Sequence, residues 1–475
     1  MRRFADIHCH PSFKSYGKSF PDKINEINPR SKKSIWCYDP QNILEKLIDL
    51  IGGIVKYRQS NLSAMGFGNT GIVFASLYPI ERGFFDNKLD SELIKDLMLN
   101  FVTSLGKERI DYIQSITDYF PDLEGEYDFI KQLDNKIIKL ADNAQYRYSI
   151  AKDSTDLDLI LNQDTSDNLK ANSIAVIITI EGAHVFGTGI NPQNKPADHQ
   201  YVLGNVDKVK NWQHRPFFIT FAHHFYNELC GHAQSLTGIV KKVADQSYGM
   251  NQGFTKLGLE VLDKLLDDSD NNRILIDIKH MSRKSRLEYF NLLDTKYKNE
   301  KIPIIISHGA VIGSEKNKHL FLQDDINFYD DEILKVAETD GLFGIQLDER
   351  RIVAAGDYEL KKSHGLSRRK VLFHSSFLIW RQIQHIAELL DSNGYFAWGI
   401  QTIGSDYDGM IDPLNGFWTA EDYPVLSDYL LKHAFNYMQD SSSQIMQSIN
   451  KIDPEEIVDR IMGDNAYQFL KKYYK

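Results

Sequence analysis

The chain has 475 residues, of which 42% are hydrophobic and 25% charged, and these are ordinary values for a soluble globular enzyme. The formal net charge is −10 with both signs interspersed, so the sequence has no basic stripe of the kind that binds nucleic acid. Three cysteines are too few for a disulfide framework, and no apolar run approaches the roughly 20 residues that span a bilayer.

The first residues lead directly into polar, chemistry-bearing positions and contain no apolar signal segment, so we predict no signal peptide. An odd, small number of cysteines fits a reducing compartment. We therefore expect a cytoplasmic protein that acts on a small molecule and has neither nucleic acid nor a membrane as partner.

Short apolar runs rich in β-formers recur along the chain, separated by segments with helical periodicity such as Phe254–Leu266. The runs are continuous rather than alternating, as expected for parallel strands buried on both faces. There are eight, namely Phe4–His8, Gly71–Leu77, Ile174–Ile180, Phe217–Phe221, Ile274–Ile278, Ile304–Ser307, Leu342–Leu347 and Ala397–Gly404. We predict an α/β fold, a single (β/α)₈ TIM barrel domain over 1–475, with long loop insertions at the catalytic face.

Polar residues that carry chemistry follow most of these predicted strands. Because all strands of such a barrel end on one face, where active sites are built, residues far apart in sequence should converge there. In chain order these residues are Glu181 after the third run, His223 and His224 after the fourth, His280 after the fifth, His308 after the sixth and Asp406 after the eighth.

His8 and His10 end the first predicted strand. Residues two apart on a strand project to the same side, so both imidazoles can reach one metal ion. Zinc accepts histidine nitrogen and carboxylate oxygen as ligands. Such a pair alone is as often structural as metal-binding, and its position on the first strand of a barrel favours ligation.

Glu181 directly follows an apolar run, and a carboxylate in that position needs a partner to offset its desolvation. Two metal ions sharing it would satisfy both oxygens, whereas pairing with a structural Arg or Lys is the alternative. His280 and His308 each follow a buried strand. One such histidine is usually a hydrogen-bonded core residue, but two on successive strands favour metal ligation.

Asp406 lies among small residues, where a carboxylate can contact a metal and take the proton from attacking water. Asp408 is the nearby alternative, more typical of a supporting or turn-forming residue. His223 or His224 could stabilise the charge that develops on a substrate carbonyl. Together, the six expected ligands suit two divalent ions, zinc being the first choice, about 3.5–4 Å apart with a bridging hydroxide. They are His8, His10, Glu181, His280, His308 and Asp406.

In their shared order, these motifs resemble those of the membrane dipeptidase (renal dipeptidase-like, peptidase M19) family of the amidohydrolase superfamily. Asp6-x-His8-x-His10 resembles its first metal motif, and Ile180-Glu-Gly-Ala-His184 its bridging-glutamate motif. Leu275–Ser282 is similar to the "DLSHVS" strand, Pro303–His308 to "VIFSHS" and Ile403–Gly409 to "GSDFDG". The ending from Asp453 to Ala466 is similar to the closing helix of the family.

The resemblance implies that Glu181 bridges two zinc ions, with His8 and His10 on one ion and His280 and His308 on the other. Asp406 would be the proton-handling residue. The family also has a substrate-facing histidine in an H-x-x-N context. His224-Phe-Tyr-Asn227 fits that spacing, while His223 fits the strand register, and the spacing narrowly favours His224.

The chain departs from the family pattern at two positions that bear on chemistry. His10 stands where the family usually has Asp, which changes the site charge by one unit. The family arginine that grips the substrate carboxylate precedes an Asn, whereas here Ile326 precedes Asn327. Arg350 or Arg351, after the seventh strand, is the substitute that we consider for substrate binding.

We therefore expect a binuclear zinc hydrolase that cleaves the amide bond of dipeptides or similar short N-acyl amino acids through a metal-bridging hydroxide. The missing arginine leaves a second hypothesis open, an enzyme of the same superfamily acting on a lactone, ester or phosphoester. A non-catalytic metal-binding barrel is the third hypothesis, which the six chemically competent positions disfavour. We also expect a homodimer, because barrels of this kind commonly dimerise.

Overall fold

The computed structural model describes residues 3–40, 55–84, 104–166, 171–237, 241, 244–441 and 443–475. Within these residues all eight predicted strands are present, each within a few residues of its expected bounds. They are β1 (Phe4–Cys9), β2 (Thr70–Leu77), β5 (Asn172–Glu181), β6 (Phe218–Thr220), β7 (Leu275–Asp277), β8 (Ile305–Gly309), β9 (Leu342–Ile345) and β10 (Gln401–Ile403).

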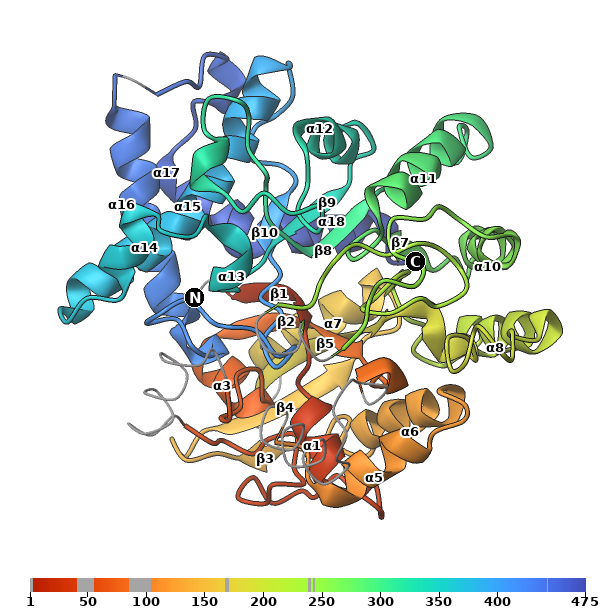
Figure 1. Ribbon diagram of the computed structural model, residues 1–475. Coiled ribbons are helices and arrows are strands. Elements are labelled where there is room, and N and C mark those ends of the chain that lie inside the picture. Colours follow the sequence, from red (N-terminus) through yellow and green to blue (C-terminus); the bar gives the residue numbers. More distant parts are fainter. Residues whose placement is uncertain are drawn as a thin grey trace.

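The eight strands follow one another in the order β1-β2-β5-β6-β7-β8-β9-β10, and each neighbouring pair is parallel. The end of the last strand returns to the first, because Cys9 and Tyr407 form a parallel bridge. There the His10 N–H donates to the Tyr407 carbonyl at 3.0 Å, and the Asp406 N–H to the His8 carbonyl at 2.9 Å. The sheet thus closes almost completely into the predicted barrel, with strands at the centre and helices outside (Figure 1).

Two further strands, which the sequence did not predict, lie in the long connection between β2 and β5. β3 (Ile138–Lys139) and β4 (Gln145–Ile150) form an antiparallel pair, and β4 runs parallel to β5. β4 pairs with the N-terminal half of β5, from Asn172 to Val176, whereas β6 pairs with its last residues, Ile180 and Glu181. The two strands therefore extend the sheet at the end of the barrel opposite the polar strand ends.

In the part of the chain that the structure describes, α-helices connect the strands and cover the outside of the barrel (Figure 1). They are α1 (Phe13–Lys18), α3 (Leu62–Phe67), α5 (Lys107–Ser115), α6 (Phe120–Lys131), α7 (Ser154–Ser166), α8 (His199–Lys210), α10 (Lys256–Leu266), α11 (Arg283–Thr295), α12 (Asp330–Glu338), α13 (Glu349–Ile352), α14 (Tyr358–Ser363), α15 (Arg368–Ser392), α16 (Tyr423–Gln439), α17 (Pro454–Asp459) and α18 (Asn465–Tyr473).

The predicted helix at 254–266 begins two residues later than expected. Thr255 is the N-cap of α10, and its side chain accepts a hydrogen bond from the Gly258 N–H at 2.9 Å. Phe254 lies before the cap and forms a bridge with Cys230. The apolar face is as predicted, since Val261 and Leu265 are fully buried.

The closing helical segment runs from Pro454 to Tyr473, but it is not a single regular α-helix. A π-helical turn, Arg460–Asp464, separates α17 from α18. Gly463 lies in this turn, where an added Cβ would lie 2.8 Å from the Arg3 carbonyl oxygen. The backbone of this π-helical turn thus lies against the start of β1.

The strands are buried on both faces, as their continuous apolar sequences predict. Every residue of β2 is buried, and so is every residue of β5 after Asn172. Full burial of one large aliphatic side chain stabilises the fold by roughly 1.5–3 kcal/mol. A close-packed interior of such side chains deforms little. Such a core fixes the positions of the polar residues at the strand ends.

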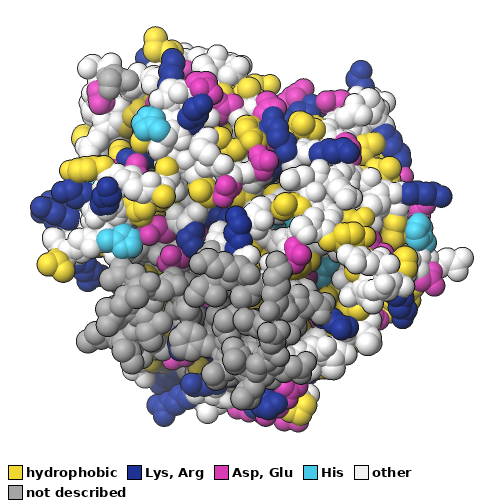
Figure 2. Space-filling view, viewed as in Figure 1, with side chains coloured by type: hydrophobic (Ala, Val, Ile, Leu, Met, Phe, Trp, Pro, Cys, Tyr) yellow, Lys and Arg dark blue, Asp and Glu magenta, His cyan; other side chains and the backbone are white. Residues whose placement is uncertain are grey.

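None of the helices described by the structure has the length and apolar character needed to cross a membrane. Figure 2 shows acidic and basic side chains mixed over the described part of one face, in agreement with the interspersed charges of the sequence.

Candidate metal centre

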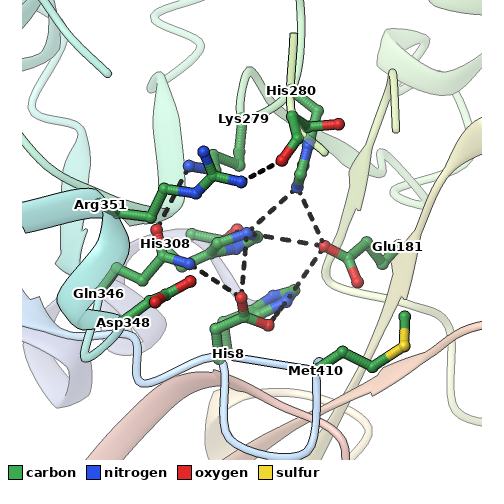
Figure 3. A network of polar contacts seen from close by, with 12 residues as sticks. His8, Glu181, Lys279, His280, His308, Gln346, Asp348, Arg351 and Met410 are labelled. Carbon is green, nitrogen blue, oxygen red and sulfur yellow. Dashed lines mark hydrogen bonds and ion pairs between the residues drawn. The ribbon is translucent and has the colours of Figure 1, made fainter. Parts of the chain in front are cut away.

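The six expected ligands lie together at the C-terminal ends of the barrel strands. Figure 3 shows His8, Glu181, His280 and His308 pointing toward one another. All are buried, with exposed fractions between 0% for His8 and 7% for Asp406. They come from β1 and its end (His8, His10), the end of β5 (Glu181), the turn after β7 (His280), β8 (His308) and the turn after β10 (Asp406).

Glu181 lies at the centre of this group, and both of its carboxylate oxygens face imidazole nitrogens. Its Oε2 is 3.1 Å from Nε2 of His10, and its Oε1 is 3.4 Å from Nε2 of His8. The same Oε1 is 3.5 Å from Nε2 of His280 and 3.7 Å from Nε2 of His308. Both oxygens thus face imidazole nitrogens, as a carboxylate shared by two cations requires.

Asp406 lies on the other side of the same imidazoles. Its Oδ1 is 3.6 Å from Nε2 of His10 and 3.8 Å from Nε2 of His8, and its Oδ2 is 3.9 Å from Nε2 of His308. Gln346 donates from Nε2 to Oδ2 of Asp406 at 2.9 Å. The carboxylate therefore has one oxygen fixed by an amide and the other facing the histidines of β1.

Two of these residues adopt a backbone conformation that is rare for residues other than glycine. The φ angles of His280 and Asp406 are 65° and 62°, in the left-handed region. Such a conformation costs on the order of 1–3 kcal/mol and is concentrated at functional sites. Gly404 lets the turn before Asp406 approach β8, because an added Cβ would lie 1.9 Å from the Ser307 carbonyl oxygen.

Hydrogen bonds to the outer ring nitrogens orient two of the histidines. Nδ1 of His10 is 3.0 Å from the Ser76 carbonyl oxygen, an acceptor, so Nδ1 carries a proton. Ser307 donates its hydroxyl to Asp277 at 2.6 Å and therefore accepts from Nδ1 of His308 at 2.8 Å. In both rings Nε2 is the nitrogen directed into the site, and it offers the lone pair that metal ligation requires when it carries no proton.

Burial and neighbouring charges set the protonation of the centre. Burial lowers the pKa of His280 and His308 well below the usual range, and nearby cationic groups act in the same direction. Against the effect of burial, His223 and His8 hold the pKa of Glu181 well below its usual value. Asp406 and Glu181 likewise outweigh burial at His10 and raise its pKa to about 10. A divalent cation would take the place of that proton.

The residues fit a divalent metal. Among the described residues, the buried Nε2 atoms of His8 and His10 face the carboxylates of Glu181 and Asp406 but make no well-aligned hydrogen bond, which is rare unless another ligand satisfies them. Imidazole and carboxylate donors suit zinc and similar ions. Within the described residues, four groups bring ligand atoms within 4.8 Å of one another: His8–His10–Glu181, His8–His308–Asp406, Glu181–His280–His308 and His223–His224–His280.

His223 and His224 point in different directions. His223 is buried, with Nε2 at 3.4 Å from Oε1 of Glu181 and Nδ1 at 2.6 Å from Oε2 of Glu81. His224 is partly exposed, and its Nδ1 lies 2.7 Å from the Ser235 hydroxyl. Sequence reasoning missed Glu81. Its signal was a carboxylate four residues beyond the second predicted strand, at the same barrel end as the other ligands.

The adjacent arginines also differ. The Arg350 guanidinium pairs with Asp348, with Nε to Oδ1 and Nη2 to Oδ2 both at 3.0 Å. Arg351 is 7% exposed and donates from Nη2 to the Ser235 carbonyl. Its buried Nη1 has no hydrogen-bond partner among the described residues. Arg351 therefore keeps unused donors beside the centre, whereas Asp348 occupies the fork of Arg350.

A second buried cation, Lys279, lies beside Arg351 (Figure 3). It is 1% exposed and donates to Oε1 of Gln346 at 3.4 Å. Burial, together with the charge of Arg351, lowers the pKa of Lys279 to about 7. This residue was not predicted to belong to the site, although it stands where the quoted family strand has Ser.

The closed parallel barrel and the buried ring of imidazoles and carboxylates define a metal-dependent hydrolase of the (β/α)₈ class. The family model "Membrane dipeptidase (Peptidase family M19)" matches residues 127–447, which is more than half of the chain. The chain belongs to this family and is a metal-dependent dipeptidase by class. The match begins after His8, His10 and Glu81, so it gives no support for assigning those three residues to the site, and the geometry supplies that support.

Solved structures agree with the fold. The probable dipeptidase PvdM from Pseudomonas aeruginosa is 13% identical, with a TM-score of 0.52, over 87% of this chain and 88% of that one. A metallopeptidase from Rhodobacter sphaeroides, solved with a phosphinate mimic of the dipeptide L-Ala-D-Ala, is 12% identical, with a TM-score of 0.51, over 100% and 99% of the two chains. At these identities the likeness shows the fold alone. Among curated proteins, no match to this sequence was found.

Proposed function

We propose that this protein is a binuclear zinc dipeptidase that cleaves the amide bond of a dipeptide or a similar short N-acyl amino acid. The observation that carries the proposal is the placement of Glu181. Its Oε2 faces His10, and its Oε1 faces His8, His280 and His308, at the catalytic end of a barrel of the M19 family.

His8 and His10 would hold one ion and His280 and His308 the other, with Glu181 between them and Asp406 beside the first ion. When bound, two such ions lower the pKa of water and polarise the scissile carbonyl group. The replacement of the family aspartate by His10 makes the protein part of the site more positive by one unit. This change favours a substrate that carries a negative charge.

Asp406 is the residue to which we assign proton handling. Gln346 fixes its Oδ2, which leaves Oδ1 to take a proton from water and later to return it to the leaving amine. This Oδ1 faces Nε2 of His10 and of His8, at 3.6 and 3.8 Å. Figure 3 shows Gln346 on the same side of the centre as His308.

His224 is suited to donate a hydrogen bond to the scissile carbonyl oxygen. Gln246 donates from Nε2 to the Ser235 hydroxyl oxygen at 2.8 Å, so the hydroxyl proton is available for Nδ1 of His224 at 2.7 Å. That arrangement favours the tautomer with the proton on Nε2. An N–H aimed at a developing oxyanion stabilises the transition state more than the ground state.

Arg351 and Lys279 would bind the carboxylate of the substrate. Two neighbouring buried cations with few partners are costly, and an anionic ligand would offset that cost. Asn327, which follows the position of the missing family arginine, donates to the Arg351 carbonyl at 2.8 Å. The chain segment of Arg351 therefore lies beside the position from which the family arginine would reach the substrate.

The direct test loads the purified protein with zinc and follows hydrolysis of dipeptides with L- and D-residues at the C-terminus, against a chelated control. We expect chelator-sensitive cleavage of dipeptides and much weaker cleavage when the terminal carboxylate is amidated. Cleavage of lactones, esters or phosphoesters without dipeptide cleavage would support the second hypothesis instead. The homodimer and the cytoplasmic location stay predictions, to be tested by light scattering and cell fractionation.

A further inference from the structure

Glu81 and His223 form a buried pair that the proposed reaction does not use. Both side chains are almost fully buried, and Glu81 Oε2 lies 2.6 Å from Nδ1 of His223. The other oxygen of Glu81 accepts the Phe225 N–H at 2.9 Å, and the Tyr78 hydroxyl donates to Oε2 at 3.2 Å. Glu81 is therefore fixed from three directions, and it fixes the imidazole in turn.

The other nitrogen of His223 points at the metal-bridging carboxylate. Its Nε2 lies 3.4 Å from Oε1 of Glu181, closer than Nε2 of His280 at 3.5 Å or of His308 at 3.7 Å. The Nε2 atoms of His280 and His308 are 3.3 Å apart. Two ligands of a tetrahedral zinc ion, each about 2.0–2.2 Å from it, lie about 3.4 Å apart. These separations are compatible with ligands of one ion, although Nε2 of His8 lies equally close to Oε1, at 3.4 Å. His223 is placed beside the second ion by His280, because ligand atoms of the two residues lie within 4.8 Å of each other and their ring centroids are 4.5 Å apart.

We propose that His223 is a ligand of the second metal ion, held in place by Glu81. The ion would then have three imidazoles, from His223, His280 and His308, and one carboxylate oxygen, from Glu181. The family resemblance assigns only the last three of these residues to that ion. The inference rests on the proposed metal centre, but it does not depend on which bond the enzyme cleaves.

The chemistry of the pair supports a ligand role. A metal-binding histidine commonly donates its outer N–H to a carboxylate, which fixes the ring and raises the basicity of the ligating nitrogen. Glu81 stands in that relation to His223, as the Ser76 carbonyl does to His10. Glu81 is thus a positioning residue that acts through His223.

The surroundings of His223 oppose a substrate-facing role. The ring is 3% exposed and lies edge-on to Tyr78 and to His280, with centroids 4.7 and 4.5 Å away. Both ring nitrogens face carboxylates inside the protein. The partly exposed His224 remains the histidine that can reach a substrate, in agreement with the H-x-x-N spacing.

The test measures metal binding rather than hydrolysis. The full-length protein, stripped of metal, is titrated with Zn²⁺ in a calorimeter and separately with Co²⁺ while the visible absorption is recorded. We expect His223→Ala to weaken one of the two zinc-binding steps by at least 100-fold and to change the cobalt spectrum. Glu81→Gln, which keeps the ring and the size of its partner, should weaken the same step by about 10–100-fold.

His224→Ala is the matched control, because it removes the neighbouring imidazole. It should keep both zinc affinities within threefold of wild type. Circular dichroism verifies folding, and Glu81→Gln tests the proposal even if His223→Ala fails to fold. Wild-type zinc affinities and an unchanged cobalt spectrum in a folded His223→Ala or Glu81→Gln protein would overturn the proposal. An equal loss in His224→Ala would instead assign the ion to the His223–His224–His280 group.

Because each variant is compared with wild type in the absence of substrate, the two proposals can fail separately. Two-ion binding that depends on His223, without dipeptide cleavage, would leave the inference standing and overturn the proposed function. Dipeptide cleavage by the wild type, with unchanged zinc affinities in His223→Ala, would overturn the inference and leave the proposed function standing.

Discussion

Gln346, which follows β9, donates a hydrogen bond at 2.9 Å to Oδ2 of Asp406, which follows β10, so that two neighbouring strands together set the orientation of one carboxylate. The same Gln346 accepts from Lys279. A chain of polar contacts therefore runs from the proton-handling carboxylate to the buried cations that we assign to the substrate. Substitution of Asp406 should therefore change mainly kcat, whereas substitution of a buried cation should change mainly KM.

Asp406→Asn should reduce kcat for dipeptide hydrolysis by about 10²–10⁴-fold, because the amide has the same size but cannot accept a proton from water. The KM should change little, since Asp406 is not assigned to the substrate carboxylate. Steady-state kinetics on the zinc-loaded protein provide the measurement, with metal content determined for each sample. Full activity in a fully metallated Asp406→Asn protein would rule out this role.

Arg351→Met should raise KM for a dipeptide, because it removes a buried guanidinium whose Nη1 has no hydrogen-bond partner among the described residues. Hydrogen bonds to charged groups contribute about 1.5–3 kcal/mol, which corresponds to roughly a 10–100-fold change. The defect should be much smaller for the corresponding dipeptide amide, which has no carboxylate to lose. An equal defect for both substrates would show that Arg351 does not bind the carboxylate.

Arg350→Met is the matched comparison, since the neighbouring guanidinium pairs with Asp348, which is 2% exposed. Removing it leaves a buried carboxylate unpaired, at a cost of about 3–5 kcal/mol. We therefore expect a lower unfolding temperature in Arg350→Met and a higher KM in Arg351→Met. If the two effects were exchanged, the assignment of the two arginines would be reversed.

The barrel and its ligands could be predicted because both depend on local sequence. A continuous apolar run identifies a strand buried on both faces, and the residue after it must lie at the end of that strand. Glu181 and His308 were found in this way. β4 was missed because it pairs with only the N-terminal half of β5, within a long connection whose pairing no local pattern specifies.

Local sequence patterns alone could not decide between adjacent residues, and only the spacing of the resembled family motif favoured His224 over His223. His223 and His224, like Arg350 and Arg351, differ by one position, and their partners come from distant segments. Glu81 is 142 residues from His223 and Ser235 is 116 residues from Arg351. Burial and pairing decide which neighbour faces the site, and these are properties of the packed chain.

Gly404→Ala should destabilise the protein by about 1–3 kcal/mol, because overpacking at a rigid contact forces the backbone to move. The new Cβ would lie 1.9 Å from the Ser307 carbonyl oxygen, on the strand that carries His308. Urea unfolding would measure the change, and zinc affinity should fall with it.

Gly204→Ala, inside α8 with nothing within 4 Å of its Cβ, should instead stabilise the protein by about 0.5–1 kcal/mol. A loss of stability in Gly204→Ala would contradict this account.

His433, on α16, should make the protein less stable in mild acid. It is buried between Phe373 and Phe377, with Nε2 at 2.9 Å from the Ser376 hydroxyl, and burial lowers its pKa to about 4. A hydrogen bond with the backbone of Phe373 raises the pKa of His433 in part, and the charges of Lys432 and His374 lower it further. Between about pH 6.5 and pH 4 the unfolded chain binds a proton at this ring that the folded chain does not, so stability falls as the pH falls, by about 3 kcal/mol at most.

His433→Gln keeps a polar partner for Ser376 but cannot titrate, so its free energy of unfolding should depend less on pH in that window. Urea unfolding of the metal-free protein at several pH values measures the slope, with His319→Gln, an exposed position, as the control. The metal-centre histidines titrate equally in all three proteins, so the difference in slope isolates His433. Parallel pH profiles for wild type and His433→Gln would mean that this ring takes up its proton in the folded protein, which its apolar surroundings oppose.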